Sequence, residues 1–448
     1  MTQRDRLDAC WIAVLLTVLY VMTATYSRAQ NADVIAAAIP AWNLATEGSP
    51  HLDAWPTDTK WIGQVGEHVV SNRLPGPILI GAAFYLLLGG PTSGDPSWPA
   101  AVYPATFAAA VTTAVAMALL FLALRHVTTR PVAITAAAAI ALATSTWSIS
   151  ADGLWTHGPA QLALALALLG ASRDRWFVSG TGWGLSVLAR PHLGLAGAVM
   201  AIWVAVNCRR WRPVVGTAVG GLAGVAVLLA YNRWTFGTWT LLGGYEESGF
   251  EHGGVGAQSF VVNVVGTLLS PERGVLIVSP FLLALLPGIP AGWRAAPDWV
   301  RGAAVGGLVY LVVQLLLNRF SGGEGFFGYR LPLEAITLAA PLLLLSFTHW
   351  TAKTLGRLRL FTVLLGLSLA TQALGAVLWR QRSGAWNPWT TYRPVDVIAE
   401  RPWAAMCVIV VVALATALVW ARLPRLHDVL GRSQAASGTP SGQKVPQR

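Results

Sequence analysis

Charge is scarce in this 448-residue chain. Asp, Glu, Lys and Arg together make up 11% of the residues, hydrophobic residues make up 54%, and the mean hydropathy is +0.55. Soluble domains carry about 25% charged residues, so this composition excludes a mostly water-facing surface. Apolar runs long enough to cross a bilayer recur along the chain. We therefore predict an all-α polytopic membrane protein whose residues 1–431 form a single transmembrane domain of about twelve helices, at 10–26, 100–124, 131–150, 158–172, 176–189, 191–206, 213–230, 275–291, 302–318, 331–348, 360–379 and 403–421.

Cysteine and lysine are also rare. The three cysteines, Cys10, Cys208 and Cys407, lie in or beside predicted spans, so the sequence offers neither a disulfide framework nor a CxxC metal motif. The histidines show no HxxxH or HExxH spacing, and no metal site is predicted. Only three of the 31 basic residues are lysines. Together with the abundance of Ala, Gly and Trp, this composition suggests a high-GC bacterium, such as an actinobacterium.

The net charge of +11 reflects membrane topology. With the N-terminus inside, the predicted cytoplasmic segments hold 19 of the 31 basic and 5 of the 20 acidic residues. This is a strong positive-inside signal, and it places both termini in the cytoplasm of a bacterial plasma membrane. The basic balance is thus explained without nucleic-acid binding. The run 76–90 fits this topology only if it lies at the outer interface instead of crossing.

Polar residues collect in the predicted outer loops, the longest of which is 27–99. The tail 432–448, rich in Ser, Gly, Gln and Pro, is predicted to be a disordered cytoplasmic segment. Within the first outer loop, 32–47 is amphipathic and predicts a helix lying on the membrane surface, with an internal break at Pro40. Asp33 stands near the start of this helix, where the helix dipole favours an ionised carboxylate.

Several short motifs follow one another on the predicted outer face. In this order and placement the chain resembles the C-type (GT-C) integral-membrane glycosyltransferases, which use polyprenyl-phosphate sugars and include protein O-mannosyltransferases and aminoarabinose transferases. The resemblance covers roughly 10–350. It depends on Asp33 and on Ser71-Asn72-Arg73-Leu74-Pro75-Gly76, Leu154-Trp155-Thr156-His157, Leu188-Ala189-Arg190-Pro191, Tyr231-Asn232 with Phe236-Gly237, Ser270-Pro271-Glu272-Arg273-Gly274, and Gly322-Gly323 with Gly328-Tyr329-Arg330.

The resemblance implies transfer of a sugar from a polyprenyl-phosphate donor to an acceptor hydroxyl at the outer face, with inversion. Asp33 would be the catalytic base, because it can accept the proton of the attacking hydroxyl. Where several members of the family carry an adjacent Asp-Glu pair, this chain has Asp33 alone. The need for a divalent cation therefore stays open, as does the acceptor, which could be a glycan, a lipid or a protein.

Arginines at headgroup depth are the candidate ligands of the donor phosphate, since a guanidinium binds phosphate oxygens in two places and stays charged beside lipid. Arg190 interrupts a long apolar stretch, and an intramembrane arginine is a functional candidate by default. The predicted donor-binding residues are Arg73, His157, Arg190, Glu272, Arg273, Tyr329 and Arg330.

Two other functions fit the same features. A transporter or flippase of a lipid-linked sugar would place polar groups near the bilayer midplane, whereas here they gather at one face. A ligase for whole lipid-linked glycans would use the same outer face and arginines, and a catalytic role of His157 would favour it.

Overall fold

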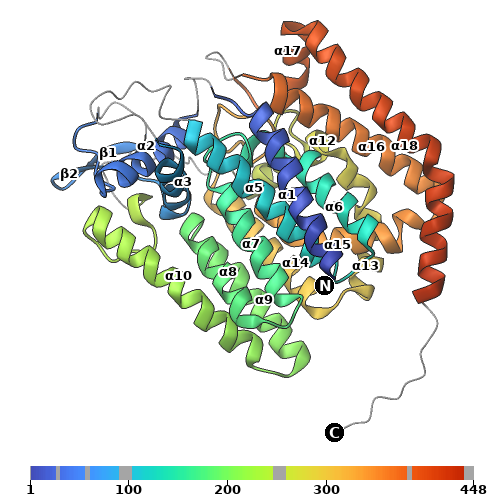
Figure 1. Ribbon diagram of the computed structural model, residues 1–448, viewed down its shortest axis with the longest axis horizontal. Coiled ribbons are helices and arrows are strands. Elements are labelled where there is room, and N and C mark those ends of the chain that lie inside the picture. Colours follow the sequence, from blue (N-terminus) through green and yellow to red (C-terminus); the bar gives the residue numbers. More distant parts are fainter. Residues whose placement is uncertain are drawn as a thin grey trace.

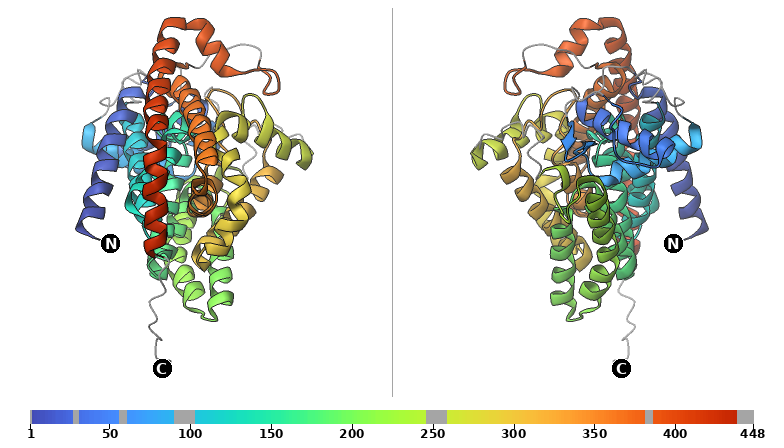
Figure 2. Two further views of the ribbon diagram at one scale, coloured as in Figure 1. Left: turned by 90° about the vertical axis from the view of Figure 1, so that its right-hand side faces the viewer. Right: turned by 90° about the vertical axis from the view of Figure 1, so that its left-hand side faces the viewer.

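Helices packed into one bundle make up most of the computed structural model (Figures 1 and 2), which describes residues 2–26, 31–55, 61–89, 103–245, 259–380 and 386–437. The α-helices are α1 (Gln3–Thr23), α2 (Ala32–Glu47), α3 (Pro75–Leu88), α5 (Tyr103–Leu124), α6 (Arg130–Leu142), α7 (His157–Ala171), α8 (Trp176–Ala189), α9 (Leu193–Cys208), α10 (Arg212–Phe236), α11 (Phe260–Leu269), α12 (Val275–Val278), α13 (Ile289–Ala295), α14 (Asp298–Leu317), α15 (Leu333–His349), α16 (Leu355–Ala373), α17 (Arg393–Glu400) and α18 (Pro402–Ser437). Shorter turns are η1 (Thr146–Ser150), η2 (Gly243–Tyr245), η3 (Pro280–Ala284), η4 (Leu286–Gly288), η5 (Thr351–Lys353) and η6 (Leu374–Leu378).

The bundle has two distinct ends. Helix α1 begins, and helix α18 ends, at the lower end in Figure 1, while α2, α3 and a small hairpin lie towards the upper end. Figure 2 shows α18 running along one side of the bundle, with α17 lying across the top. The hairpin pairs β1 (Ile62–Val65) with β2 (His68–Ser71) in antiparallel register, and it is the exception to the predicted all-α fold among the described residues.

The twelve predicted spans are not confirmed as such. By length and composition, seven helices of the described chain can cross a membrane: α1, α5, α10, α14, the α15–η5 stretch, the α16–η6 stretch and α18. Helices α6, α7 and α9 are apolar but shorter. These apolar helices are those of a multi-pass membrane protein, with α3 and α11 as further short apolar segments.

One predicted span, 275–291, is not a continuous helix. The segment divides into α12, η3, η4 and the start of α13. Pro280, Pro287 and Pro290 follow one another at short intervals in this stretch. Proline lacks the backbone N–H that an α-helix needs and its ring collides with the preceding turn, so the run of apolar residues cannot stay in one helix.

Helix α2 forms where the sequence predicts a helix, but nine of its sixteen residues are buried in the protein, and Pro40 does not break it. Asn31 caps the helix by accepting a hydrogen bond from the Asp33 N–H at 2.8 Å. Proline removes the bond that the carbonyl of Ala36 would otherwise accept. The hydroxyl of Ser71, on β2, donates to that carbonyl at 2.6 Å. The hairpin therefore satisfies the backbone group that proline leaves free, and α2 continues to Glu47.

Glycines set the spacing between α8 and α10. A Cβ at Gly224 would lie 2.1 Å from the Gly184 carbonyl oxygen, and one at Gly220 would lie 2.4 Å from the Phe177 carbonyl oxygen. No side chain fits at either position. Small residues four apart let membrane helices approach until their backbones touch, which gives dispersion contacts that larger residues would prevent.

The predicted disorder of the C-terminal tail, 432–448, stays a prediction. Helix α18 extends to Ser437, into the segment predicted to be disordered, and residues 438–448 lie outside the described residues.

Candidate active site

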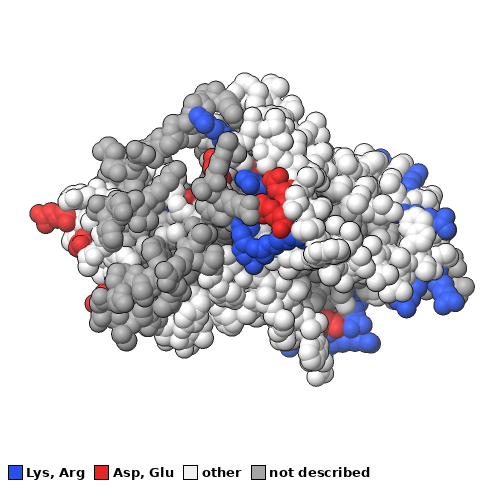
Figure 3. All heavy atoms as spheres, turned by 90° about the horizontal axis from the view of Figure 1, so that it is seen from above, with Lys and Arg blue, Asp and Glu red and all other residues white. Residues whose placement is uncertain are grey.

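Three clusters of charged side chains lie at the upper end of the bundle. Viewed from above, basic and acidic side chains meet near the middle of this face (Figure 3). The first cluster is centred on Asp33, in the first turn of α2. Its carboxylate pairs with the guanidinium of Arg330 and lies 3.5 Å from Arg73 Nη1. The exposed fraction of the side chain is 13% for Asp33, 21% for Arg330 and 9% for Arg73, so solvent reaches the cluster only in part.

The backbone brings these three residues together from distant parts of the chain. Arg73 follows β2, and its Nε donates to Asn72 Oδ1 at 2.8 Å while its guanidinium lies over the Trp61 ring, at 4.9 Å from the ring centre. Arg330 precedes α15, and the amide of Asn31 donates to the Glu324 carbonyl oxygen at 2.5 Å. The start of α2 is therefore tied to the loop that leads to Arg330.

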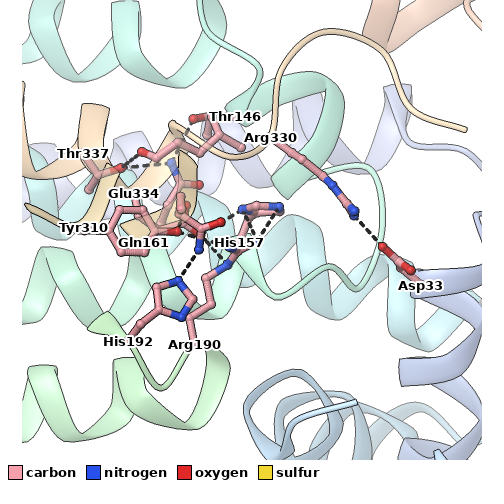
Figure 4. A network of polar contacts seen from close by, with 12 residues as sticks. Asp33, Thr146, His157, Gln161, Arg190, His192, Tyr310, Arg330, Glu334 and Thr337 are labelled. Atoms are coloured by element: carbon pink, nitrogen blue, oxygen red, sulfur yellow. Dashed lines mark hydrogen bonds and ion pairs between the residues drawn. The ribbon is translucent and has the colours of Figure 1, made fainter. Parts of the chain in front are cut away.

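The second cluster is more deeply buried than the first and lies beside it in Figure 4. Glu334, in the first turn of α15, has a side chain with no exposed surface. Its Oε1 lies 2.8 Å from His157 Nδ1 and 3.1 Å from Arg190 Nε, and its Oε2 accepts from the Tyr310 hydroxyl at 2.9 Å. Arg190 also contacts Tyr310 at 3.2 Å and His157 Nε2 at 3.1 Å. The nitrogens of Arg190 thus point inward, towards the network.

The polar network continues deeper into the bundle. Gln161 donates to the hydroxyls of Thr146 and Thr337 at 3.0 and 3.1 Å. On the other side, the His192 ring stacks on Tyr310 with centroids 5.1 Å apart and pairs with Gln314. Buried polar groups are costly unless they are hydrogen-bonded, so these hydrogen bonds hold together the helices that carry them. Oε1 of Gln161 is left without a hydrogen-bond partner among the described residues.

The third cluster joins the start of α12 to the segment before α17. Glu272 accepts from Arg393 Nε at 2.9 Å and from the indole of Trp386, and it lies 3.2 Å from Arg273 Nη2. Arg273 Nη1 donates to the carbonyl oxygens of Phe326 and Gly328 at 2.9 and 2.7 Å. Arg273 therefore holds the loop that leads to Arg330, and its fork is occupied by protein groups.

Two aromatic rings connect the clusters. The guanidinium of Arg330 lies 5.2 Å from the ring centres of both Trp155 and Phe326. The guanidinium carbon of Arg273 lies 3.7 Å from the centre of the Phe326 ring, and the ring centres of Trp155 and His157 are 6.4 Å apart. The cations thus rest on a shared aromatic surface, where the ring quadrupoles favour them.

The predicted residue Tyr329 is a packing residue in this structure. It is 2% exposed, its hydroxyl lies 2.9 Å from Ser279 Oγ, and its N–H donates to Ser145 Oγ at 3.1 Å. Gly328 beside it has φ +84°, and a Cβ there would lie 2.3 Å from Ser145 Oγ. Only glycine fits this turn, which aims the next residues of the chain at Asp33.

Asp152 is an acidic residue that the sequence analysis did not single out. Its Oδ1 accepts from the Thr25 N–H at 2.6 Å. Burial raises the pKa of the Asp152 carboxyl to about 6. It lines a recess of about 30 Å³ together with Asn31 and Trp155, beside the Asp33 cluster. The recess has room for about one water molecule.

The residues around Asp33 do not suit a divalent cation. Among the described residues, no group of three or more His, Cys, Asp or Glu side chains gathers as metal ligands would. Asp33 already faces two guanidinium groups, whose positive charge opposes a second cation at the same carboxylate.

Comparisons with known proteins give a fold. No family model and no curated protein matches the chain. Solved structures of the oligosaccharyltransferase of Archaeoglobus fulgidus do match. The complex with zinc and sulfate has a TM-score of 0.52 at 13% identity, covering 84% of this chain and 54% of that chain. This is an oligosaccharyltransferase-like fold.

Two further structures of that enzyme agree. The apo form has a TM-score of 0.50 at 15% identity over 92% of this chain and 55% of that chain. The form tethered to an acceptor peptide has a TM-score of 0.51 at 14% identity, covering 85% of this chain and 56% of that chain. The present chain thus spans about half the length of the oligosaccharyltransferase. At these identities the similarity concerns the fold.

Of the predicted site residues, the structure brings Asp33, Arg73 and Arg330 into one cluster, His157 and Arg190 into a second, and Glu272 and Arg273 into a third. Sequence reasoning missed their partners Glu334, Tyr310, Trp386 and Arg393. Glu334 was the easiest to find, because an acidic residue inside an apolar run is itself a signal. Tyr310 has no such signal in the sequence.

Proposed function

We propose that this protein is a membrane glycosyltransferase that moves a sugar from a polyprenyl-phosphate donor to an acceptor hydroxyl. The reaction takes place at the upper end of the bundle, which is the outer face of a bacterial plasma membrane with both termini in the cytoplasm. The observation that carries the proposal is the Asp33 carboxylate paired with Arg330 beside Arg73, at one membrane end of an oligosaccharyltransferase-like fold.

Charge balance supports an anionic substrate. The three clusters contain five arginines and three carboxylates, namely Arg73, Arg190, Arg273, Arg330 and Arg393 with Asp33, Glu272 and Glu334. An excess of positive charge in a poorly hydrated site is unfavourable unless it is compensated. A lipid-linked phosphate supplies negative charge at this depth, and arginine forks bind its oxygens.

Asp33 becomes an effective base only when its arginines have another partner. In the present structure its Oδ2 accepts a hydrogen bond from Arg330, and its Oδ1 lies 3.5 Å from Arg73 Nη1. When the donor phosphate engages Arg330 and Arg73, the carboxylate is released to accept a proton. Donor binding therefore activates the base, and the acceptor reacts only after the donor is in place.

The step is a single displacement. The acceptor oxygen attacks the anomeric carbon while its proton passes to Asp33. The bond from the anomeric carbon to the phosphate oxygen breaks, and its electron pair leaves with the polyprenyl phosphate, which the arginines stabilise. Because attack and departure occur on opposite faces of the carbon, the configuration inverts.

The test uses purified protein with a panel of short-chain polyprenyl-phosphate sugars, measuring donor binding and release of lipid phosphate. Asp33→Asn is expected to bind donor and to lose release by about 10²–10⁴-fold, the usual contribution of a general base. The matched control is Asp53→Asn, in the same outer loop, whose carboxylate pairs with His68 at 3.0 Å. Full turnover by Asp33→Asn would refute the proposed base.

Transfer of a whole lipid-linked glycan is a second candidate, favoured by the oligosaccharyltransferase fold. It would use the same phosphate ligands and the same displacement. The donor panel separates the two, since a glycan ligase would release lipid phosphate only from donors that carry several sugars. Donor binding without release, accompanied by lipid scrambling in liposomes, would instead indicate a flippase.

A further inference from the structure

A second feature lies on the far side of the bundle from the Asp33 cluster. Helices α6, α15, α16 and α18 enclose an apolar groove of about 560 Å³. Its lining contains no charged residue, and its polar side chains are the hydroxyls of Thr129, Thr135, Thr362 and Thr416. A groove of this size accommodates a drug-sized or larger ligand, but this lining offers no set of hydrogen-bond partners for a hydrophilic one.

The depth of the groove matches one leaflet of a bilayer. On α18 the lining extends from Ala415 to Leu426, which at 1.5 Å per residue is about 17 Å. The hydrocarbon core of a bilayer is about 30 Å thick, so the groove spans roughly half of it. Near its upper end α16 and α18 touch, since a Cβ at Gly366 would lie 2.5 Å from Thr416 Oγ1.

Positive charge lies near the lower end of the groove. Arg422 and Arg425 are exposed on α18, next to the lining residues Leu423 and Leu426. Arg359 is exposed at the start of α16 and lies over the Trp420 ring at 5.4 Å from its centre. In the described part of the chain, no ion pair is formed between these three arginines and an acidic side chain.

Asp5 and Asp8, two acidic residues of α1 at this end of the bundle, are already engaged. Asp8 pairs with Arg130, at the start of α6, through contacts that include Oδ1 to Nη2 at 2.6 Å. Asp5 pairs with Arg125 at 2.8 Å. Three basic side chains thus lie near the lower end of an apolar groove that is about one leaflet deep.

We propose that this groove binds an anionic phospholipid of the leaflet at the lower end of the bundle. Its acyl chains fill the space between α6, α15, α16 and α18, and its phosphate contacts Arg422, Arg425 and Arg359. Basic residues close to a membrane surface attract anionic headgroups, and arginine binds phosphate through two parallel hydrogen bonds. The bound lipid completes the packing of α18. The other contacts of α18 with the bundle are made mainly with α16 and with η5 and η6, the turns at the two ends of α16.

The proposal is independent of glycosyl transfer, because the groove and the Asp33 cluster share no residue. The test is native mass spectrometry of the full-length protein, delipidated in detergent and titrated with phosphatidylglycerol or phosphatidylcholine. Wild type is expected to retain phosphatidylglycerol in preference. Affinity should fall about fivefold for each of Arg422→Gln and Arg425→Gln, the usual effect of one basic residue at a membrane surface.

Two further variants separate the headgroup from the chains. The double variant Ala136→Phe/Ala415→Phe fills the groove from α6 and α18 and should abolish retention while leaving lipid-phosphate release unchanged. Arg210→Gln removes an exposed arginine at the same end but away from the groove, and should bind phosphatidylglycerol as wild type does.

Three results would overturn the proposal: equal retention of phosphatidylcholine, equal loss of affinity in Arg210→Gln, or full retention in the groove-filling variant. Displacement of the lipid by inorganic phosphate alone would show a headgroup site without a chain site and would also overturn it. Tighter binding of polyprenyl phosphate that is unaffected by Arg422→Gln would assign the groove to the donor lipid instead.

Discussion

Replacing Glu334 by glutamine tests whether charge pairing stabilises the buried network beside the Asp33 cluster. Glu334 has no exposed side-chain surface and is the only acidic group in direct contact with Arg190 among the described residues. Glutamine preserves its size and can still bond Tyr310, but it carries no negative charge. The substitution therefore removes the charge that compensates Arg190 without creating a cavity.

The expected cost is large for a single conservative change. Removing one partner of a buried ion pair typically destabilises a protein by about 3–5 kcal/mol, since the remaining charge stays buried and uncompensated. Arg190 has a side chain that is 12% exposed, so part of this penalty is relieved by solvent. We expect the free energy of unfolding to fall by about 2–4 kcal/mol, with the lower figure reflecting this exposure.

The measurement is a double-mutant cycle of Glu334→Gln, Arg190→Met and the two combined, each unfolded in mixed micelles and followed by tryptophan fluorescence. Arg190→Met alone should also destabilise, because it leaves the Glu334 carboxylate buried with fewer donors. The combined variant should be more stable than the sum of the single effects predicts, by roughly 1–3 kcal/mol.

Additive effects in the cycle would refute this reasoning, as would a Glu334→Gln variant within about 0.5 kcal/mol of wild type. A suitable control is Arg212→Gln, whose partner Asp174 lies 3.1 Å away but with both side chains more than 60% exposed. Exposed pairs contribute little, so this variant should remain within about 1 kcal/mol of wild type.

Three further outcomes are expected at the upper end of the bundle. Arg330→Lys should weaken donor binding about tenfold or more and leave a residual rate that Asp33→Asn lacks, because lysine keeps the charge but not the fork; equal effects of the two changes on kcat would contradict this. Gly328→Ala should lower stability by about 1–3 kcal/mol through the clash with Ser145, whereas Gly356→Ala, with no atom within 4 Å of the added Cβ, should not; thermal unfolding compares them. The pKa of Asp152 is raised to about 6 from its ordinary value of 3.8, so the stability that its protonated form contributes is complete below pH 3.8 and is lost as the pH rises through about 6. Asp152→Asn should therefore flatten the pH dependence of the unfolding midpoint between about pH 4 and 7. An unchanged slope would contradict the assignment.

The sequence is informative about this molecule where local pattern controls structure. The existence of a helix at 32–47 and of most of the apolar helices follows from the hydropathy pattern, because each is decided by neighbours in the chain. The prolines of 275–291 indicate a break in the helix, but the sequence analysis predicted one span because the apolar run is long. Pro40 had the opposite outcome, since its free carbonyl partner is satisfied by Ser71, and such a tertiary contact cannot be read from the helix itself.

The candidate site is predictable to a lesser degree. The motifs identified arginines of the right kind but not which carboxylate each one meets. Arg190 and His157 were predicted to bind phosphate, but in the structure both side chains contact Glu334. Arg273 likewise has its fork filled by the carbonyl oxygens of Phe326 and Gly328. Pairings across a hundred or more residues depend on how the helices pack, and no spacing rule encodes them.

The loop from Gly322 to Arg330 explains why these inward-facing arginines still matter for a reaction at Asp33. Arg273 fixes the loop through its carbonyl oxygens, Asn31 bonds the Glu324 carbonyl, and Arg330 ends the loop at the Asp33 carboxylate. The base and its principal phosphate ligand are therefore placed by one segment that is clamped on both sides. Since a misplacement of about 1 Å can cost a hundredfold in rate, changes at Arg273 should act on turnover by moving Arg330, although Arg273 itself has no free donor pair to offer a phosphate.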